Sequence, residues 1–213
     1  MIPKVIHQIW FGDKSRRPVA WMRTWQDAHP DWEYRLWTEE NLPPLRAQRA
    51  FDAMPHWCGK ADIARYEILE QIGGVYIDAD SECLMPLTDD LLANRAFAAH
   101  ENEYWRPGLF ANGFVGCEPK VPFLAQLTDH ILSLPNLSVC PAGDVWKLTG
   151  PLAFTRIIGQ GAHSYVRLYP SFWFYPEHCS GMKYTGTMDR CYARQFWGST
   201  KENVYPAASQ VER

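Results

Sequence analysis

The sequence predicts one α/β domain with a mainly parallel central sheet and helices on both of its faces. Residues 4–11, KVIHQIWF, are a mostly apolar run typical of a buried parallel strand. In residues 60–72 the apolar side chains recur at helical spacing, and the glycine pair at 73–74 supplies the positive φ at which helices commonly end. The β-branched and aromatic residues 75–77 follow directly and are too few for anything but a strand. A helix between two buried strands indicates the α/β class.

The remaining segments continue this alternation of helices and strands. Residues 18–29 carry an amphipathic pattern with an aromatic stripe, which predicts a helix packed on the core. Pro151 lies near the first turn of another predicted helix, and the preceding Thr149 is suited to cap it. The other elements that we expect are strands 32–37, 97–100, 110–117 and 166–175 and helices 42–53, 121–132 and 151–158.

Length and composition favour a single globular domain. A chain of 213 residues is long enough to bury about 70% of its unfolded surface. Its hydrophobic content of 46% and charged content of 21% exclude a disordered chain, and its net charge of −3 lacks the basic surplus of a nucleic-acid binder. We therefore expect a catalytic domain over residues 1–200, a C-terminal tail over residues 201–213 and no nucleic-acid partner.

The sequence predicts a cytoplasmic location. No basic segment followed by an apolar run opens the chain, and no stretch approaches the roughly 20 apolar residues of a membrane span. The six cysteines form no C-x-x-C pair, which favours reduced thiols over a zinc site or a disulfide framework. We expect no transmembrane segment but peripheral contact with the inner membrane face, and the sequence leaves delivery into another cell open.

Two aspartates, Asp78 and Asp80, follow the predicted strand 75–77 where it ends in a loop. Ligands bind at such strand ends in open α/β sheets, and two carboxylates spaced i, i+2 offer a hard divalent cation oxygen ligands while leaving positions for substrate phosphates. An Asp-x-Asp pair also arises by chance, so its context decides. The preceding helix places Asp62 and Arg65 at i, i+3, which suits sugar hydroxyls or phosphate oxygens, although spacing alone favours an ordinary surface ion pair.

Residues 60–87, KADIARYEILEQIGGVYIDADSECLMPL, resemble the sugar-binding segment of the DXD-containing glycosyltransferases of family 32. That family includes yeast α-1,6-mannosyltransferases and bacterial capsular polysaccharide enzymes, and it is distantly similar to the clostridial glucosylating toxins. The matching stretches continue in the same order along the chain: IPKVIHQIWFG, HPDWEYRLWTEENL, NGFVG, LTGP and YPSFWFYP. The resemblance implies a glycosyltransferase A-like fold and a role in polysaccharide biosynthesis.

The resemblance implies catalytic and metal-binding roles for five residues. Asp62 and Arg65 would orient the donor sugar, and Asn112 would face the reacting sugar. Asp80 would bind Mn²⁺ or Mg²⁺ held against the diphosphate, while Asp78 would bind the ribose, the metal or a metal-bound water.

The resemblance also implies a set of nucleotide contacts. Trp10 would stack on the base with Ile9 beside it, although core packing explains Trp10 equally well from the sequence alone. Trp57 borders the nucleotide in the toxin relatives. The remaining contacts that we expect are Tyr76, Asp78 and Ser199.

Residues 192–200, YARQFWGST, depart from the family pattern. Family members carry here a strand with a histidine, followed by Gly-Ser-Trp, which closes over the diphosphate and helps to hold the metal. In this chain Gln195 stands where the histidine is expected, and Thr200 replaces the tryptophan. A glutamine carbonyl is able to bind a hard cation but carries no charge. Gln195 is therefore a candidate neutral metal ligand in place of the histidine, and the alternative is a metal held by Asp80, the diphosphate, water and Ser199.

These observations predict a metal-dependent glycosyltransferase that moves a hexose from a nucleotide diphosphate sugar to a hydroxyl of a glycan or lipid-linked glycan. The resemblance implies retention of anomeric configuration, and we favour a UDP-linked donor over a GDP-linked one. A sugar-binding or nucleotide-sugar-binding protein without turnover is the alternative that the altered Gln195 position suggests. A metal-dependent phosphohydrolase is disfavoured, because such enzymes usually carry threonine two places after the second aspartate, where this chain has Glu82.

Overall fold

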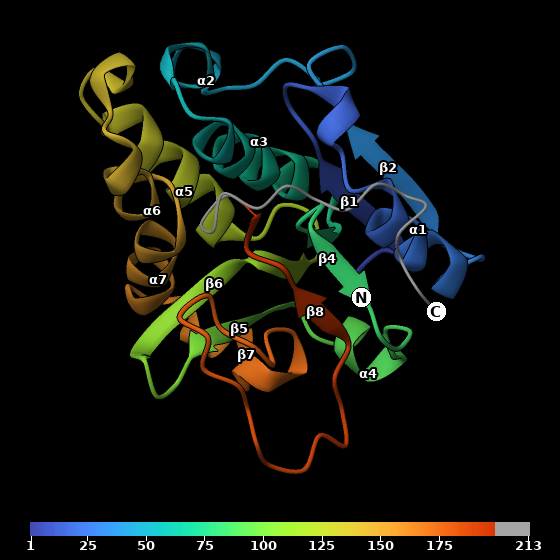
Figure 1. Cartoon of the computed structure of the whole chain (residues 1–213). Helices are drawn as coiled ribbons and strands as arrows, with labels where there is room; N and C mark the ends of the chain where they lie inside the picture. The colour runs from blue at the N-terminus through green and yellow to red at the C-terminus, as the bar shows by residue number, and fades with distance from the viewer. Residues whose placement is uncertain (199–213) are drawn as a thin grey trace.

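The computed structural model describes residues 1–198 and places a six-stranded sheet at the centre of the molecule, with strand order β2-β1-β3-β6-β5-β7 (Figure 1). The strands are β1 (Val5–Ile9), β2 (Glu33–Trp37), β3 (Gly74–Ile77), β5 (Ala96–Asn102), β6 (Arg106–Cys117) and β7 (Val166–Tyr169). β1 is parallel to β2 and β3, and β5 is parallel to β7, whereas β6 is antiparallel to both of its neighbours. The mainly parallel α/β sheet predicted from the sequence is confirmed.

The strands send alternate side chains into two separate cores, one on each face of the sheet. On β3, Tyr76 belongs to one core, while Val75 and Ile77 belong to the other. On β5, Ala98 and Phe97 divide in the same way. Because strand side chains alternate between faces, both faces of the sheet are covered, which explains why the strands read as continuous apolar runs.

The first core lies beneath the larger group of helices (Figure 1). These helices are α2 (Gln48–Ala53), α3 (Trp57–Ile72), α5 (Pro122–Ser133), α6 (Val145–Leu148) and α7 (Pro151–Gly159). Tyr66 of α3 stacks on Phe154 of α7 with ring centroids 6.2 Å apart, and both side chains are fully buried. At its C-terminus α3 ends at Gly73, where φ is 69°. The buried helix α3 therefore delivers the chain directly into β3.

The second core is covered by α1 (Val19–Ala28), α4 (Asp89–Leu92) and a small antiparallel sheet of β4 (Ser81–Cys83) and β8 (Ala193–Gln195). Trp25 of α1 is fully buried, and its indole Nε1 donates a hydrogen bond to the carbonyl oxygen of Ser81 at 2.8 Å. Through its pairing with β4, the late strand β8 lies beside the segment that directly follows β3.

Several sequence-based boundaries are wrong, among them the start of β6, which lies at Arg106 instead of residue 110. The strand expected over residues 166–175 ends at Tyr169, because Pro170 has no N–H for a strand ladder and Ser171–Trp173 forms a 3-10 turn. The helix expected over residues 42–53 is only α2. Further 3-10 turns lie at Lys14–Arg16, Leu137–Val139, Ala142–Asp144 and Ala162–Ser164.

Several sequence predictions concern features away from the sheet. The six cysteines, all within residues 1–198, form no disulfide. In the same part of the chain, no helix has the length and apolar character needed to cross a bilayer. Ser199 and the tail predicted at residues 201–213 lie outside the described residues, and the predicted domain division stays a prediction.

Candidate functional site

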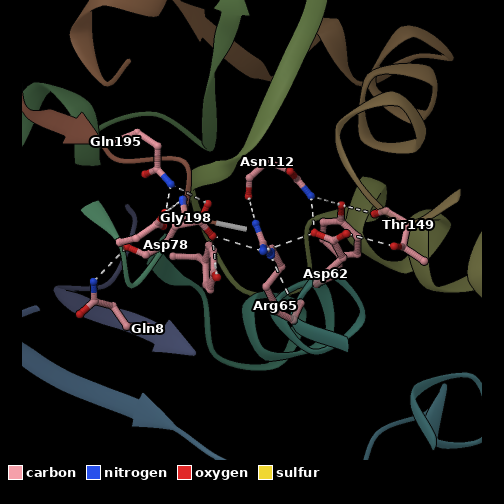
Figure 2. Close-up of polar contacts among 12 residues, drawn as sticks. Gln8, Asp62, Arg65, Asp78, Asn112, Thr149, Gln195 and Gly198 are labelled. Atoms are coloured by element: carbon pink, nitrogen blue, oxygen red, sulfur yellow. Dashed lines mark hydrogen bonds and ion pairs between the residues drawn. The ribbon is translucent and has the colours of Figure 1, made fainter. Parts of the chain in front are cut away.

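Asp62 lies on the buried side of α3 and is the centre of a hydrogen-bond network (Figure 2). Its Oδ1 accepts a hydrogen bond from Asn112 Nδ2 at 2.8 Å and lies 3.3 Å from Arg65 Nη2. Its Oδ2 accepts a hydrogen bond from Thr149 Oγ1 at 3.0 Å. Burial raises the pKa of the Asp62 carboxyl to about 6, against the opposing effect of the Arg65 charge. The predicted Asp62–Arg65 pair is therefore a buried pair and not a surface one.

Arg65 joins α3 to the end of β3 and to the middle of β6. Its Nη1 donates to the carbonyl oxygen of Asn112 at 2.6 Å, and its Nη2 lies 3.3 Å from Asp78 Oδ1. The guanidinium also sits over the ring of Tyr76, 4.2 Å from the centroid. A planar group with five donors makes these simultaneous contacts, which a lysine could not reproduce. Arg65 consequently fixes Asp62, Asp78 and β6 relative to one another.

Asp78 follows β3 and faces the cavity with 27% of its side chain exposed. Its Oδ1 accepts from the Tyr76 hydroxyl at 2.9 Å, and its backbone N–H donates to the carbonyl oxygen of Gly113 at 2.9 Å. Gly113 has no side chain at a point where a Cβ would lie 2.3 Å from Asp78 Oδ2. The glycine in the sequence FANGFVG is therefore required by the close approach of this carboxylate.

Asp80 is nearly enclosed, with 8% of the residue exposed, and its partners come from residues 193–198, which we call the C-terminal arm. Gln195 Nε2 donates to Asp80 Oδ1 at 2.7 Å, and the backbone N–H of Gly198 donates to Asp80 Oδ2 at 2.6 Å (Figure 2). Gln195 Nε2 also lies 3.4 Å from Asp78 Oδ2. The pairing of Ser81 with Gln195 between β4 and β8 brings these groups together.

These residues line a single cavity of about 730 Å³. All the predicted site residues within residues 1–198 border it: Ile9, Trp10, Trp57, Asp62, Arg65, Tyr76, Asp78, Asp80, Asn112 and Gln195. Trp57 is 52% exposed, so its ring is available to a ligand, whereas Ile9 is 4% exposed at the end of β1. The structure therefore brings the predicted residues together, while their individual roles stay predictions and Ser199 lies outside the described residues.

Asp78 and Asp80 offer the oxygen ligands of a site in which a divalent cation is bound by the protein and by a substrate together. Within residues 1–198 no group of three or more His, Cys, Asp or Glu side chains could hold a metal ion. Asp78, Asp80 and the carbonyl of Gln195 would hold the cation, with phosphate and water oxygens in its other positions. Burial and the neighbouring charge of Asp78 raise the pKa of the Asp80 carboxyl to about 6. A bound cation would relieve both effects, so these residues fit the metal.

The side-chain amide of Gln195 presents its nitrogen to the aspartates. A half-turn of the amide would present its oxygen instead, because the two ends have nearly the same shape. Gln195 is thus a hydrogen-bond donor to Asp80 in this structure and a metal ligand only in the flipped orientation.

Sequence reasoning assigned Thr149 to the wrong partner and missed several lining residues. Thr149 does not cap α7, whose N-cap is Gly150, and donates instead to Asp62 and to the carbonyl oxygen of Val145. The lining residues that it missed include Glu101, Arg106, Trp146 and Tyr175. No local motif marks them, although the polar residues 101–106 directly after a predicted strand are a signal of the kind that located Asp78.

A family comparison matches the same region of the chain. Residues 15–98, which contain Asp62, Arg65, Asp78 and Asp80, match the model described as a glycosyltransferase sugar-binding region containing a DXD motif. Residues 15–98 are thus similar to the sugar-binding region of the DXD glycosyltransferases. The resemblance stated from the sequence is therefore confirmed.

Two curated proteins that are similar to this chain come from Schizosaccharomyces pombe. Inositol phosphoceramide mannosyltransferase 1 is 29% identical over 87% of this chain and 63% of its own length. Inositol phosphoceramide mannosyltransferase 3 is 33% identical over 74% of this chain and 44% of its own length. The chain thus spans less than two thirds of either relative.

A solved structure titled PaToxG Glycosyltransferase superimposes with a TM-score of 0.61 over 75% of this chain and 69% of that chain. The sequence identity is 19%, so this similarity concerns the fold. It confirms the glycosyltransferase fold that was expected for the DXD family.

Proposed function

We propose that this chain transfers a hexose from a nucleotide diphosphate sugar to a hydroxyl of a glycan or glycoconjugate in a metal-dependent reaction. The observation that carries the proposal is the meeting of Asp78 and Asp80 with Asp62, Arg65 and Asn112 in one cavity. Such a cavity combines an acidic pair for a metal-bound diphosphate with polar groups for sugar hydroxyls.

The Asp62 network orients the donor sugar in this proposal. Asp62 and Asn112 are each less than 8% exposed and hydrogen-bonded to each other, so their remaining acceptor and donor groups are fixed in direction. Arg65 holds both in place and supplies positive charge beside Asp78. Groups fixed before the substrate arrives need no reorganisation when the sugar bond breaks, which favours reaction over mere binding.

The acidic pair stabilises the departing nucleotide in this proposal. Breaking the anomeric C–O bond places negative charge on the diphosphate, and a divalent cation held by Asp78 and Asp80 supplies charge stabilisation there. Gln195 and Gly198 keep the Asp80 carboxylate directed at that position through their two hydrogen bonds. Trp10 and Trp57 flank the nucleotide end of the cavity, where their rings suit a base.

For the donor we propose a mannosyl nucleotide. The sequence favoured a UDP-linked sugar, but both curated relatives are named as mannosyltransferases, and mannose is commonly activated as GDP-mannose. GDP-mannose is therefore the first donor to test, with UDP-glucose and UDP-galactose beside it. The proposal also includes transfer with retention and a glycan or lipid-linked acceptor. It further includes a cytoplasmic location with peripheral membrane contact. Product NMR tests retention, and an inverted anomeric linkage would contradict it.

The decisive experiment measures Mn²⁺-dependent release of nucleotide diphosphate from these donors. Asp80→Ala is expected to lower the rate by about 100-fold or more, because it removes the buried metal ligand. Asp89→Ala is the matched control, since Asp89 is an exposed aspartate with 85% of its side chain accessible. Equal rates for Asp80→Ala and wild type would refute the proposal, as would rates that a chelator leaves unchanged.

A sugar-nucleotide-binding protein without turnover is the second candidate. One observation favours it: the amide nitrogen of Gln195 already donates hydrogen bonds to both aspartates. The amide also has no charge with which to help hold a metal. Stabilisation of the fold by GDP-mannose with Mn²⁺ in a thermal shift assay, without nucleotide release, would support this candidate.

A further inference from the structure

One end of the cavity has no role in the proposed donor site. Glu101, Arg106 and Trp146 border it and are joined through the Arg106 guanidinium, and Tyr175 lines the same cavity. Glu101 is at the end of β5 and is 5% exposed. A carboxylate buried to this extent requires partners that compensate for its lost hydration.

The partners of Glu101 satisfy only one of its two oxygens. His178 Nε2 lies 3.1 Å from Glu101 Oε1, and Arg106 Nη1 lies 3.6 Å from the same oxygen. Within residues 1–198, Oε2 has no hydrogen-bond partner, yet it is not among the enclosed polar atoms that lack one. His178 is itself fully buried and Glu101 lines the cavity, so the carboxylate is held firmly through Oε1 while Oε2 is left for a ligand.

Tyr175 supplies a second observation at the same end. Its hydroxyl is enclosed and has no hydrogen-bond partner in the described part of the chain, and the residue is only 3% exposed. A Cβ at Gly113 would lie 3.3 Å from this hydroxyl and 2.3 Å from Asp78 Oδ2, which places the hydroxyl beside the acidic pair. A buried hydroxyl without a partner is costly, so an incoming oxygen atom is its natural complement.

The chemistry of this end suits a neutral polyhydroxylated ring. The Arg106 guanidinium sits over the Trp146 ring, 4.9 Å from the centroid, which fixes an aromatic surface at the cavity border. Aromatic faces pack against the apolar faces of sugars, and a carboxylate accepts hydrogen bonds from their hydroxyls. The negative charge of Glu101 disfavours a phosphate at this point, so the group recognised here is a hydroxyl-bearing ring.

We propose that Glu101 binds the acceptor: its Oε2 accepts a hydrogen bond from a hydroxyl of a sugar or cyclitol ring, and the Tyr175 hydroxyl bonds to the same ring. This inference rests on the proposed glycosyl transfer and assigns its second substrate. His178 and Arg106 are positioning residues, because they act through Glu101 Oε1. Glu101 takes no proton in this role, so the reaction itself is unchanged.

The test separates hydrolysis of the donor from transfer. GDP-mannose and Mn²⁺ are supplied either alone, to measure hydrolysis, or with methyl α-mannoside or myo-inositol, to measure transfer by mass spectrometry. Glu101→Gln is expected to keep hydrolysis within about twofold of wild type and to lower the transfer kcat/KM by about 10- to 100-fold, as for a lost charged hydrogen bond. Tyr175→Phe is expected to act in the same direction with a smaller loss.

Glu103→Gln is the matched control, because Glu103 lies two residues along the chain and bonds to Ser171 outside the cavity lining. It should leave the ratio of transfer to hydrolysis unchanged, and Glu101→Asp should restore part of the transfer lost in Glu101→Gln. An equal loss of hydrolysis and transfer in Glu101→Gln would overturn the inference, as would no loss of either. Wild-type hydrolysis without transfer to either probe would also overturn it. Absence of both activities in wild type would instead refute the proposed function.

Discussion

Asp62 and Asp80 are the two most buried carboxylates of the donor site, yet they are held in opposite ways. Both are less than 9% exposed, and burial raises the pKa of each to about 6. Asp62 is stabilised by the charge of Arg65 and by donors from β6 and from the segment before α7. Asp80 has two neutral donors from the C-terminal arm and the like charge of Asp78 beside it.

This difference teaches which part of the site the polypeptide completes by itself. The Asp62 network contains its own compensating cation and sits on long, buried elements. The surroundings of Asp80 lack such a charge within the described residues, and they depend on β8, a strand of three residues. The charge of Asp62 is therefore compensated by the protein itself. In the function that we propose, the charge of Asp80 is compensated only when a divalent cation binds with the substrate.

The largest loss of stability is expected when Arg65 of the Asp62 network is replaced by lysine. A lysine cannot bridge Asp62, Asp78 and the Asn112 carbonyl together, so the buried charges lose compensation and the free energy of unfolding should fall by about 3 kcal/mol. Urea unfolding with an unchanged m-value measures this. Arg35→Lys is the control, because Arg35 pairs with Glu33 at the surface and such pairs contribute about 0–1 kcal/mol. Similar losses in the two variants would contradict the distinction.

A smaller effect on stability is expected where Asp78 joins the two regions. In Gly113→Ala the added methyl overlaps Asp78 Oδ2, which must move into the cavity. Because the cavity can accept the displaced carboxylate, we expect a loss of only about 1 kcal/mol in unfolding free energy but about tenfold in nucleotide release.

The matched substitution for Gly113→Ala is Gly159→Ala. A Cβ at Gly159 meets its nearest atom, His163 Nε2, at an ordinary 4.0 Å. That variant should change neither quantity. A Gly113→Ala enzyme with full activity would show that the position of Asp78 is not important.

The smallest expected effect comes from replacing Gln195, which tests how the surroundings of Asp80 bind the metal. Gln195→His introduces the residue that resembling family members carry, and a neutral imidazole binds Mn²⁺ more strongly than an amide. The Mn²⁺ concentration for half-maximal nucleotide release should fall by about 3- to 10-fold, and Gln195→Ala should raise it. If Gln195 serves only to hold Asp80 through its hydrogen bond, both variants should instead require more Mn²⁺.

Much of the donor half of the site was predictable because its residues are marked by local patterns. Asp62 and Arg65 share one helix face, and Asp78 and Asp80 follow a strand end, so spacing marked both pairs as candidates and the resemblance to the DXD glycosyltransferases selected the functional interpretation. The glycine pair after α3 likewise fixed the boundary between helix and strand. The resemblance then added Asn112, whose contact with Asp62 spans 50 residues of sequence.

The other half was not predictable because tertiary packing alone creates it. Glu101 and His178 are 77 residues apart, and neither belongs to a pattern that anticipates their contact. Tyr175 was assigned to a strand, but Pro170 interrupts that strand and a 3-10 turn redirects the chain. Thr149 has the residue type and position of a helix cap, and yet the buried carboxylate of Asp62 is its partner instead.

The pairing of β4 with β8 also determines when the site becomes complete during synthesis. Asp80 and Gln195 are 115 residues apart, so a ribosome has translated nearly all of the described chain before the second aspartate receives its partners. Since domains form from the N-terminal end as they emerge, Asp62, Arg65 and Asp78 are all available to assemble before β8 appears. The nascent chain therefore builds its sugar-facing support first and encloses its second acidic residue last.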